Sequence, residues 1–235
     1  MTNRVQVDPR VQEAFPDYAV LVIYARGLIN SASNDASLAL LRAAESDART
    51  AFGEEKPQTH PHIAAWREAF GKFGAKPSRY PCSVEALLTR TLKGQDLPAI
   101  NDVVDRYNAV SVRHVLPIGG ENLDALTSDV MLTLAAGDEP FDVMTGGEQQ
   151  IELPPPGEVI WADSSGITCR RWNWRQGYRT RLTEDTRNAW FVLDRLSPYS
   201  MESLLTAGDD LIASLRHTSP DCKIDTELIG PMPAA

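Results

Sequence analysis

The feature that most constrains the fold of this chain is a change of pattern near residue 116. Before this point, four segments rich in alanine, leucine and periodically spaced apolar residues predict helices. After it, short β-rich runs are separated by glycine and proline turns, which is typical of antiparallel strands. One more helical segment follows them. A block of helices followed by a block of strands predicts an α+β fold, with a helical part packed on a mostly antiparallel sheet.

The predicted elements have approximate bounds. We expect helices over residues 35–52, 61–73, 84–92, 100–112 and 200–215. We expect strands over residues 18–25, 130–134, 157–162, 167–174 and 189–193. We expect residues 1–14 to be a polar lead-in, residues 15–218 to form a single domain, and the proline-containing residues 219–235 to be a loose tail.

Composition excludes several classes of protein. The net charge of −9 disfavours a protein that coats nucleic acid, and we expect no DNA partner. The chain has neither an apolar run of about 18 residues nor a secretory signal, so we expect no membrane contact. The widely separated Cys82, Cys169 and Cys222 predict neither a disulfide framework nor a zinc site. We therefore expect a cytoplasmic protein with no metal and no cofactor.

A basic and aromatic run, Cys169–Arg181 (CRRWNWRQGYRTR), interrupts this acidic chain. In a strand, Arg170, Trp172 and Trp174 would share one face, and Arg171, Asn173 and Arg175 would share the other. Arginine binds phosphate or carboxylate, and indole rings stack on bases. The alternative is an edge strand with an aromatic core face, whose arginines pair with the chain's own carboxylates. The sequence leaves both interpretations open.

The common sequence motifs of serine hydrolases and of P-loop nucleoside-triphosphatases are absent. No Gly-x-Ser-x-Gly occurs, which disfavours a serine hydrolase, and no P-loop occurs. Asp102 and Asp105 lie three residues apart on a predicted helix, where they could act as an acid–base pair. A helix cap and an ion-pair partner are the favoured roles. His60 and His62 are expected to begin a helix rather than to bind a metal.

Several segments in order resemble the B3/B4 domain, which is the editing module of the β subunit of bacterial phenylalanyl-tRNA synthetase. They are Leu97–Asn108 (LPAINDVVDRYN), Leu116–Gly120 (LPIGG), Leu123-Asp124 and Thr183–Thr186 (TEDT). Others resemble freestanding proteins built from this domain. These are His60–Ile63 (HPHI), Trp66-Arg67, Lys76-Pro77, Ser83–Leu87 (SVEAL) and the run from Arg170 to Gln176. The resemblance covers roughly residues 60 to 195.

The resemblance implies a cleft between the helical part and the sheet that takes the aminoacylated 3′ end of a tRNA. A positioned water would hydrolyse the ester without a covalent nucleophile, and the enzyme would be an aminoacyl-tRNA deacylase. Asn108 would hold the water or ribose, and Gly119 and Gly120 would offer backbone N–H groups to the oxyanion. Substrate would be bound by the remaining site residues: Tyr107, Pro117, Ile118, Arg171, Asn173, Trp174, Arg175 and Gln176.

The chain departs from the synthetase pattern at two places. Gly119-Gly120-Glu121 stands where the module usually has His-Ala-Phe, and Gln176 falls near its tyrosine-recognising glutamate. Glutamine bonds a hydroxyl but brings no negative charge. Three functions stay open: a deacylase acting in trans, a module that binds tRNA or an amino-acid-like ligand without chemistry, and a catalyst on an unrelated small molecule.

Overall fold

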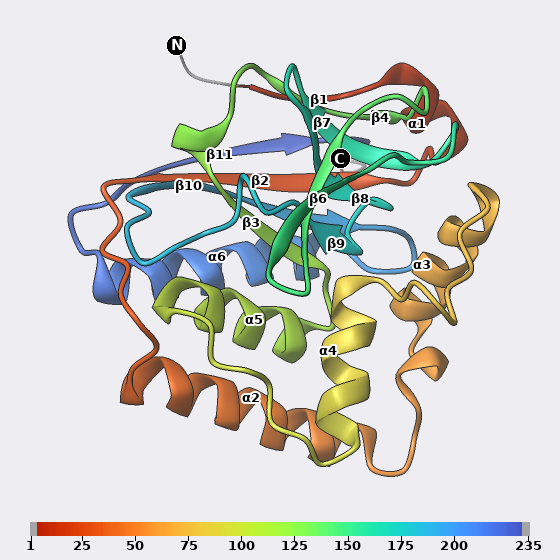
Figure 1. The fold of residues 1–235 in the computed structure, drawn as a ribbon. Coiled ribbons are helices and arrows are strands. Elements are labelled where there is room, and N and C mark those ends of the chain that lie inside the picture. Colours follow the sequence, from red (N-terminus) through yellow and green to blue (C-terminus); the bar gives the residue numbers. More distant parts are fainter. Residues whose placement is uncertain (1–3, 232–235) are drawn as a thin grey trace.

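Two sheets lie one above the other on a layer of helices in the computed structural model, which describes residues 4–231 (Figure 1). The four-stranded sheet is antiparallel, and its order is β11 (Lys223–Ile229), β2 (Ala19–Arg26), β10 (Asn188–Arg195) and β3 (Ile118–Asn122). The five-stranded sheet has the order β1 (Val5–Val7), β4 (Val130–Leu134), β7 (Val159–Asp163), β8 (Gly166–Arg170) and β9 (Arg175–Gln176). Only the β1–β4 pair is parallel.

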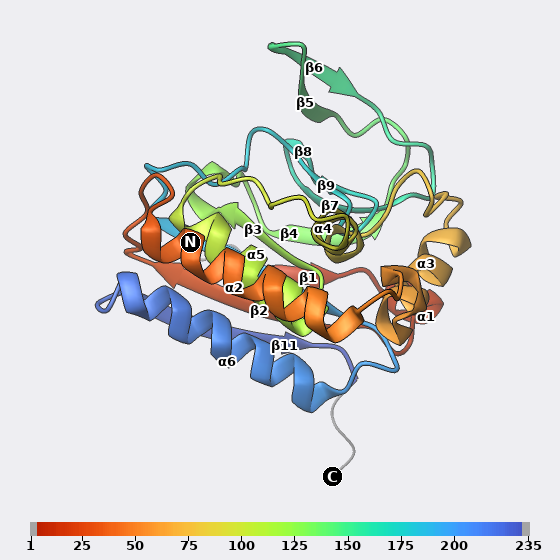
Figure 2. The ribbon, with the colours of Figure 1, turned by 90° about the horizontal axis from the view of Figure 1, so that it is seen from below.

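Five longer helices form the helical part of the described residues. They are α2 (Asp35–Phe52), α3 (Pro61–Lys72), α4 (Ser83–Leu92), α5 (Asp102–His114) and α6 (Met201–Thr218), and a short α1 (Pro9–Ala14) follows β1. Helices α5 and α6 pack on the sheet, and α2 covers α5 from outside (Figure 1). A hairpin, β5 (Phe141–Thr145) and β6 (Glu148–Glu152), projects from the body (Figure 2). This architecture confirms the predicted α+β class.

Strand β2 is apolar along its length because both of its faces are buried. Its Leu21 and Ile23 belong to the core formed with α5 and α6. Its Val20 and Val22 belong to a second core, formed with the five-stranded sheet and with α2, α3 and α4. Successive residues of a strand point to opposite faces, so one strand serves both cores.

Both ends of the described chain differ from expectation. The predicted polar lead-in contains β1, which pairs with β4, and α1, which is capped by Asp8. The predicted loose tail contains β11, which pairs with β2 from Lys223 to Ile229. Backbone pairing with a buried strand holds this segment in place although its polar side chains are all exposed. Residues 1–3 and 232–235 of the two predicted segments lie outside the described range.

The helix boundaries follow local capping. Asn34 and Asn101 accept hydrogen bonds from backbone N–H groups in the first turns of α2 and α5. Asp102 forms a buried ion pair with Arg106 at 2.7 Å. Asp105 accepts hydrogen bonds from Ile100 N and from the Ser37 hydroxyl. The two carboxylates therefore have the structural roles that the sequence favoured over an acid–base pair.

Candidate functional site

A cavity of about 270 Å³ lies where α4 and α5 meet β3 and the segment between β8 and β9. It gathers residues from six separated parts of the chain, which include β7 (Val159–Asp163) and β10. Nine of the eleven predicted site residues line it: Tyr107, Asn108, Ile118, Gly119, Gly120, Asn173, Trp174, Arg175 and Gln176. Pro117 and Arg171 are not among the lining residues. The structure therefore brings together the three segments that the resemblance assigned to one pocket.

The segment 171–174 is a turn and not the continuation of a strand, so the predicted alternation of faces is wrong. Arg171 and Trp172 have φ angles of 45° and 64°, in the left-handed region. Trp172 is fully buried, and its ring packs edge-on against Phe15, Tyr18 and Trp66 at centroid distances of 4.8 to 5.2 Å. This packing holds a backbone conformation that a bulky residue rarely adopts.

Two arginines of the basic run are neutralised inside the chain. Arg170 forms two 2.8 Å hydrogen bonds to Glu158 and one of 2.9 Å to Glu152. Arg171 lies 3.4 Å from Glu158, and its guanidinium stacks 3.7 Å from the ring centroid of Tyr80. For these two residues, pairing with the chain's own carboxylates is the correct interpretation. The prediction that Arg171 faces the ligand is wrong because its side chain is buried in this cluster.

The side chain of Arg175 remains 40% exposed, and its nearest carboxylate, Glu152, lies at 4.0 Å. Arg175 and Gln176 also line a second depression of about 230 Å³ beside hairpin β5–β6. We call this depression the outer groove; its other lining residues are Val143, Met144, Gly177, Tyr178 and Arg181. Arg181 stacks on the ring of Tyr178 at 3.4 Å. The outer groove therefore adds cationic and aromatic groups next to the cavity.

Gly119 and Gly120 lie within edge strand β3 rather than in a turn. The Gln176 side-chain amide donates to the Gly120 carbonyl oxygen at 2.7 Å, on the side of β3 that faces away from β10. The N–H and C=O groups of one residue in an antiparallel strand point to the same side. The Gly120 N–H therefore also points away from β10, whereas that of Gly119 points toward β10. Of the two predicted oxyanion donors, Gly120 has the suitable orientation.

A buried polar network holds the lining residue Asn173. Its side-chain amide donates to Asp194 at 3.2 Å, and the Tyr18 hydroxyl donates to the other Asp194 oxygen at 2.7 Å. Burial raises the pKa of Asp194 to about 7, although both hydrogen bonds favour the carboxylate. The backbone carbonyl oxygen of Asn173 accepts a hydrogen bond from Ser83 N at the start of α4. Asn173 is thus fixed through both its side chain and its backbone.

Eight further lining residues were not predicted as site residues, and Glu121, Trp161 and Cys169 are among them. Burial raises the pKa of Glu121 to about 8. Burial also raises the pKa of the Cys169 thiol well above its ordinary value, so this thiol does not supply a thiolate nucleophile. No histidine lines the cavity. Glu121 could have been noticed from its place directly after Gly119-Gly120, where the chain departs from the synthetase pattern.

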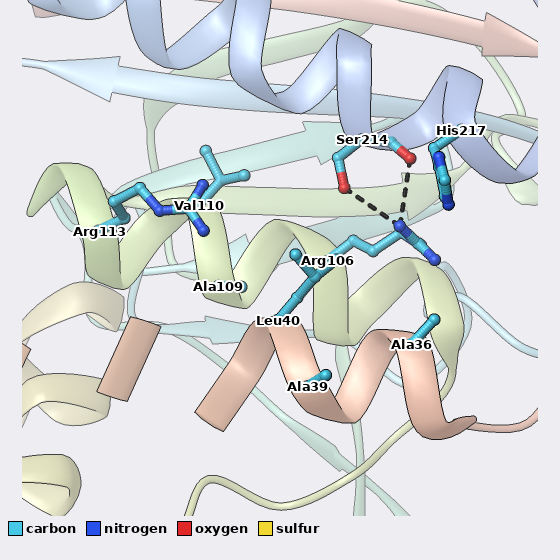
Figure 3. A pocket seen from close by; sticks show the side chains of 9 residues that line it. All are labelled: Ala36, Ala39, Leu40, Arg106, Ala109, Val110, Arg113, Ser214 and His217. Atoms are coloured by element: carbon cyan, nitrogen blue, oxygen red, sulfur yellow. Dashed lines mark hydrogen bonds between the residues drawn. The ribbon is translucent and has the colours of Figure 1, made fainter. Parts of the chain in front are cut away.

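A larger cavity of about 450 Å³ lies between α2, α5 and α6 (Figure 3). Arg106 lies on its wall and donates to the Ser214 hydroxyl and carbonyl oxygens at 3.4 Å, in addition to its pair with Asp102. The wall otherwise consists mainly of small and aliphatic side chains. No predicted site residue lines this cavity. We therefore take the smaller cavity as the candidate site.

Within residues 4–231, no three histidine, cysteine, aspartate or glutamate side chains gather closely enough to bind a metal ion. In the same range, each helix is too short or too polar to span a bilayer.

The fold is an α+β domain with a cavity between its helices and an edge strand. The model of the B3/4 domain family matches residues 65–204, which is more than half of the chain. The chain belongs to this family.

Among solved structures, the chain is similar to an N-terminal fragment of the phenylalanyl-tRNA synthetase β-subunit from Pyrococcus horikoshii. The sequence identity is 13% and the TM-score is 0.47. The match covers 95% of this chain and 50% of that fragment, so the chain spans about half of its length. No curated protein sequence matches the chain.

Proposed function

We propose that this protein hydrolyses the ester bond of mischarged aminoacyl-tRNA in trans, using a positioned water. The observation that carries the proposal is the convergence of Asn108, Gly120 and the 173–176 segment on one cavity of a B3/4 domain. By the resemblance of the sequence to the synthetase editing module, these segments would take the aminoacyl end of a tRNA. The volume of about 270 Å³ suits an amino-acid side chain and its ester.

The groups around the cavity favour attack by water rather than by the protein. Burial keeps the Cys169 thiol protonated, and no histidine is present there to activate Ser83. Asn108 has an amide that can orient a water or a ribose hydroxyl. The outward N–H of Gly120 can stabilise negative charge on the ester oxygen in the transition state. The substrate's own terminal ribose would supply the remaining help.

The outer groove supports a tRNA partner. Arg175 and Arg181 can contact phosphates, and the ring of Tyr178 offers a face for a base. Arg170 and Arg171 take no part, because Glu158 pairs with both. We place the protein in the cytoplasm, where Cys82, Cys169 and Cys222, all free in the structure, would stay reduced.

The test is release of amino acid from a panel of tRNAs, each charged with a non-cognate amino acid. Catalytic turnover of at least one substrate, unchanged after chelation of metals, is the expected result. The alternative is a module that binds tRNA or an amino-acid-like ligand without chemistry. The acidic net charge of −9, and the neutral Gln176 near the position of the synthetase's glutamate, favour this second function. Saturable binding without release of amino acid would establish it.

A further inference from the structure

Two hydrogen-bond acceptors in the wall of the candidate site have no partner within the described residues. They are Oε2 of Glu121 and Oδ1 of Asn173, and both side chains are more than nine-tenths buried. Both residues line the cavity, and they belong to different segments, β3 and the turn before β9. A buried acceptor without a donor is costly, and most such atoms find a partner. The two unpartnered acceptors in the wall of one cavity point to a ligand with hydrogen-bond donors.

The surroundings of Glu121 favour a cationic donor. The Thr168 and Thr180 hydroxyls lie near its carboxyl group and favour its ionised form, but both hydroxyls and Oε2 of Glu121 remain without a hydrogen bond within residues 4–231. The other electrostatic neighbours of the carboxyl group are Tyr107, Cys169 and the Asp163–Arg179 ion pair. Arg179 lies 2.7 Å from Asp163, which leaves Glu121 without a cation of its own. The aromatic residues Tyr107, Trp161 and Trp172 line the same cavity, together with Trp174, whose ring already lies near the guanidinium groups of Arg171 and Arg175. Aromatic faces beside a carboxylate are a favourable site for an ammonium group.

We propose that Glu121 and Asn173 bind an ammonium group of the ligand, and that the site selects esters with a free α-amine. An ammonium carries three N–H donors, enough for both oxygens. The identification of this amine as that of an aminoacyl group rests on the proposed function. The assignment of an ammonium site does not. A cation beside Glu121 favours the ionised carboxyl group, so binding of an ammonium group at pH 6 releases a proton from it.

The test uses three probes: phenylalanine methyl ester, its Nα-acetyl derivative, and methyl 3-phenylpropanoate, which lacks the amine. Binding to the full chain is measured by calorimetry at pH 6, where the amine of the free probe is already protonated, in two buffers of different ionisation enthalpy. The free amine should bind at least about tenfold more tightly than the other two, as expected for a charged hydrogen bond. Its binding should release up to about one proton, a signal that a merely structural glutamate would not produce.

The isosteric variant Glu121→Gln should lose both the preference and the proton release, while Glu202→Gln, on the exposed start of α6, should keep both. Equal binding of the three probes, or binding of none, would overturn the proposal. Hydrolysis of Nα-acetylated and free aminoacyl-tRNA at equal rates would reject the amine site and leave the proposed function standing. Preference for the free amine without any hydrolysis would reject the proposed function and leave the ammonium site standing.

Discussion

The side-chain amide of Asn173 donates to the carboxylate of Asp194 at 3.2 Å, and this bond ties the wall of the cavity to the centre of the four-stranded sheet. Because the other Asp194 oxygen accepts from Tyr18 at 2.7 Å, the carboxylate has little freedom to turn. An ionised carboxylate accepts hydrogen bonds but cannot donate them, so it fixes which end of the Asn173 amide faces it. The carbonyl end is then left for a ligand.

Asp194→Asn should lower activity or ligand affinity roughly tenfold, because an amide partner no longer fixes the orientation of Asn173. It should not lower stability at pH 8. The pKa of Asp194 is raised in the folded protein, so its contribution to stability declines as pH rises from about 4 through about 7. Urea unfolding at pH 5 and pH 8 and an activity assay test both points. Tyr18→Phe, which keeps the Asn173–Asp194 bond, serves as the control; equal activity losses in both variants would contradict this role for Asp194.

Arg175→Ala should weaken tRNA binding, whereas Arg171→Ala should lower the stability of the fold. Loss of Arg175 should weaken tRNA binding by about 1–3 kcal/mol and make the log–log salt dependence shallower by roughly 0.7–0.9 per lost phosphate contact. Loss of Arg171 should leave binding nearly unchanged but destabilise the fold by about 1–3 kcal/mol, because it pairs with Glu158 and stacks on Tyr80. Filter binding at several salt concentrations and urea unfolding separate the two effects. Unchanged tRNA binding in the Arg175 variant would show that the outer groove does not bind tRNA.

Alanine substitutions at the two adjacent glycines of β3 should lower the free energy of unfolding by different amounts. A Cβ atom at Gly120 would lie 2.8 Å from two ring carbons of the fully buried Phe191. Gly120→Ala should therefore cost about 1–3 kcal/mol of unfolding free energy, as overpacked cores do. A Cβ atom at Gly119 would meet only Val192, at an ordinary 3.5 Å. Gly119→Ala should be tolerated, and an equal loss in the two variants would contradict the described register of β3 and β10.

His62 should make the fold sensitive to acid. It is buried, with its ring nitrogens bonded to the Val115 carbonyl oxygen and the Trp66 indole N–H, and burial lowers its pKa to about 4. The unfolded chain binds a proton more readily below pH 6.5, so this residue's contribution to stability is lost as pH falls from about 6.5 toward 4. The loss between pH 7.5 and pH 5 should be about 2 kcal/mol.

The comparison that isolates this effect is wild type against His62→Gln, with unfolding measured at both pH values. Asp194 and Glu121 have raised pKa values and contribute with the opposite sign, but they are present in both proteins. A wild-type pH dependence equal to that of the variant would show that His62 is not the acid-sensitive group.

The sequence predicted the helices and central strands because their signals are local. The helix over 35–52 has the predicted bounds, since Asn34 caps it and Gly53 follows it. The start of α5 falls two residues later than expected because Asn101 is its cap. Strand β11 was not predicted because it forms by pairing with β2, which lies about 200 residues away in the sequence. Hairpin β5–β6 carried only the Gly146-Gly147 turn as a signal.

For the candidate site, the resemblance located the lining segments, and residue patterns misjudged the geometry between them. Arg170 to Trp174 alternates as a strand would, yet the burial of Trp172 among Phe15, Tyr18 and Trp66 forces a left-handed turn. The pairing of Arg171 with Glu158 and the tie from Asn173 to Asp194 are tertiary contacts. Spacing along a chain does not specify such contacts.

The most direct test of the central claim is single-turnover deacylation, with the protein in excess over a mischarged tRNA drawn from the panel. Wild-type protein should release the amino acid well above the buffer rate. Asn108→Ala should slow release by roughly 100-fold or more while tRNA binding stays within about threefold, as expected for a group that acts on the attacking water. Release no faster than in buffer for every tRNA of the panel, or full activity in the Asn108 variant, would contradict the account.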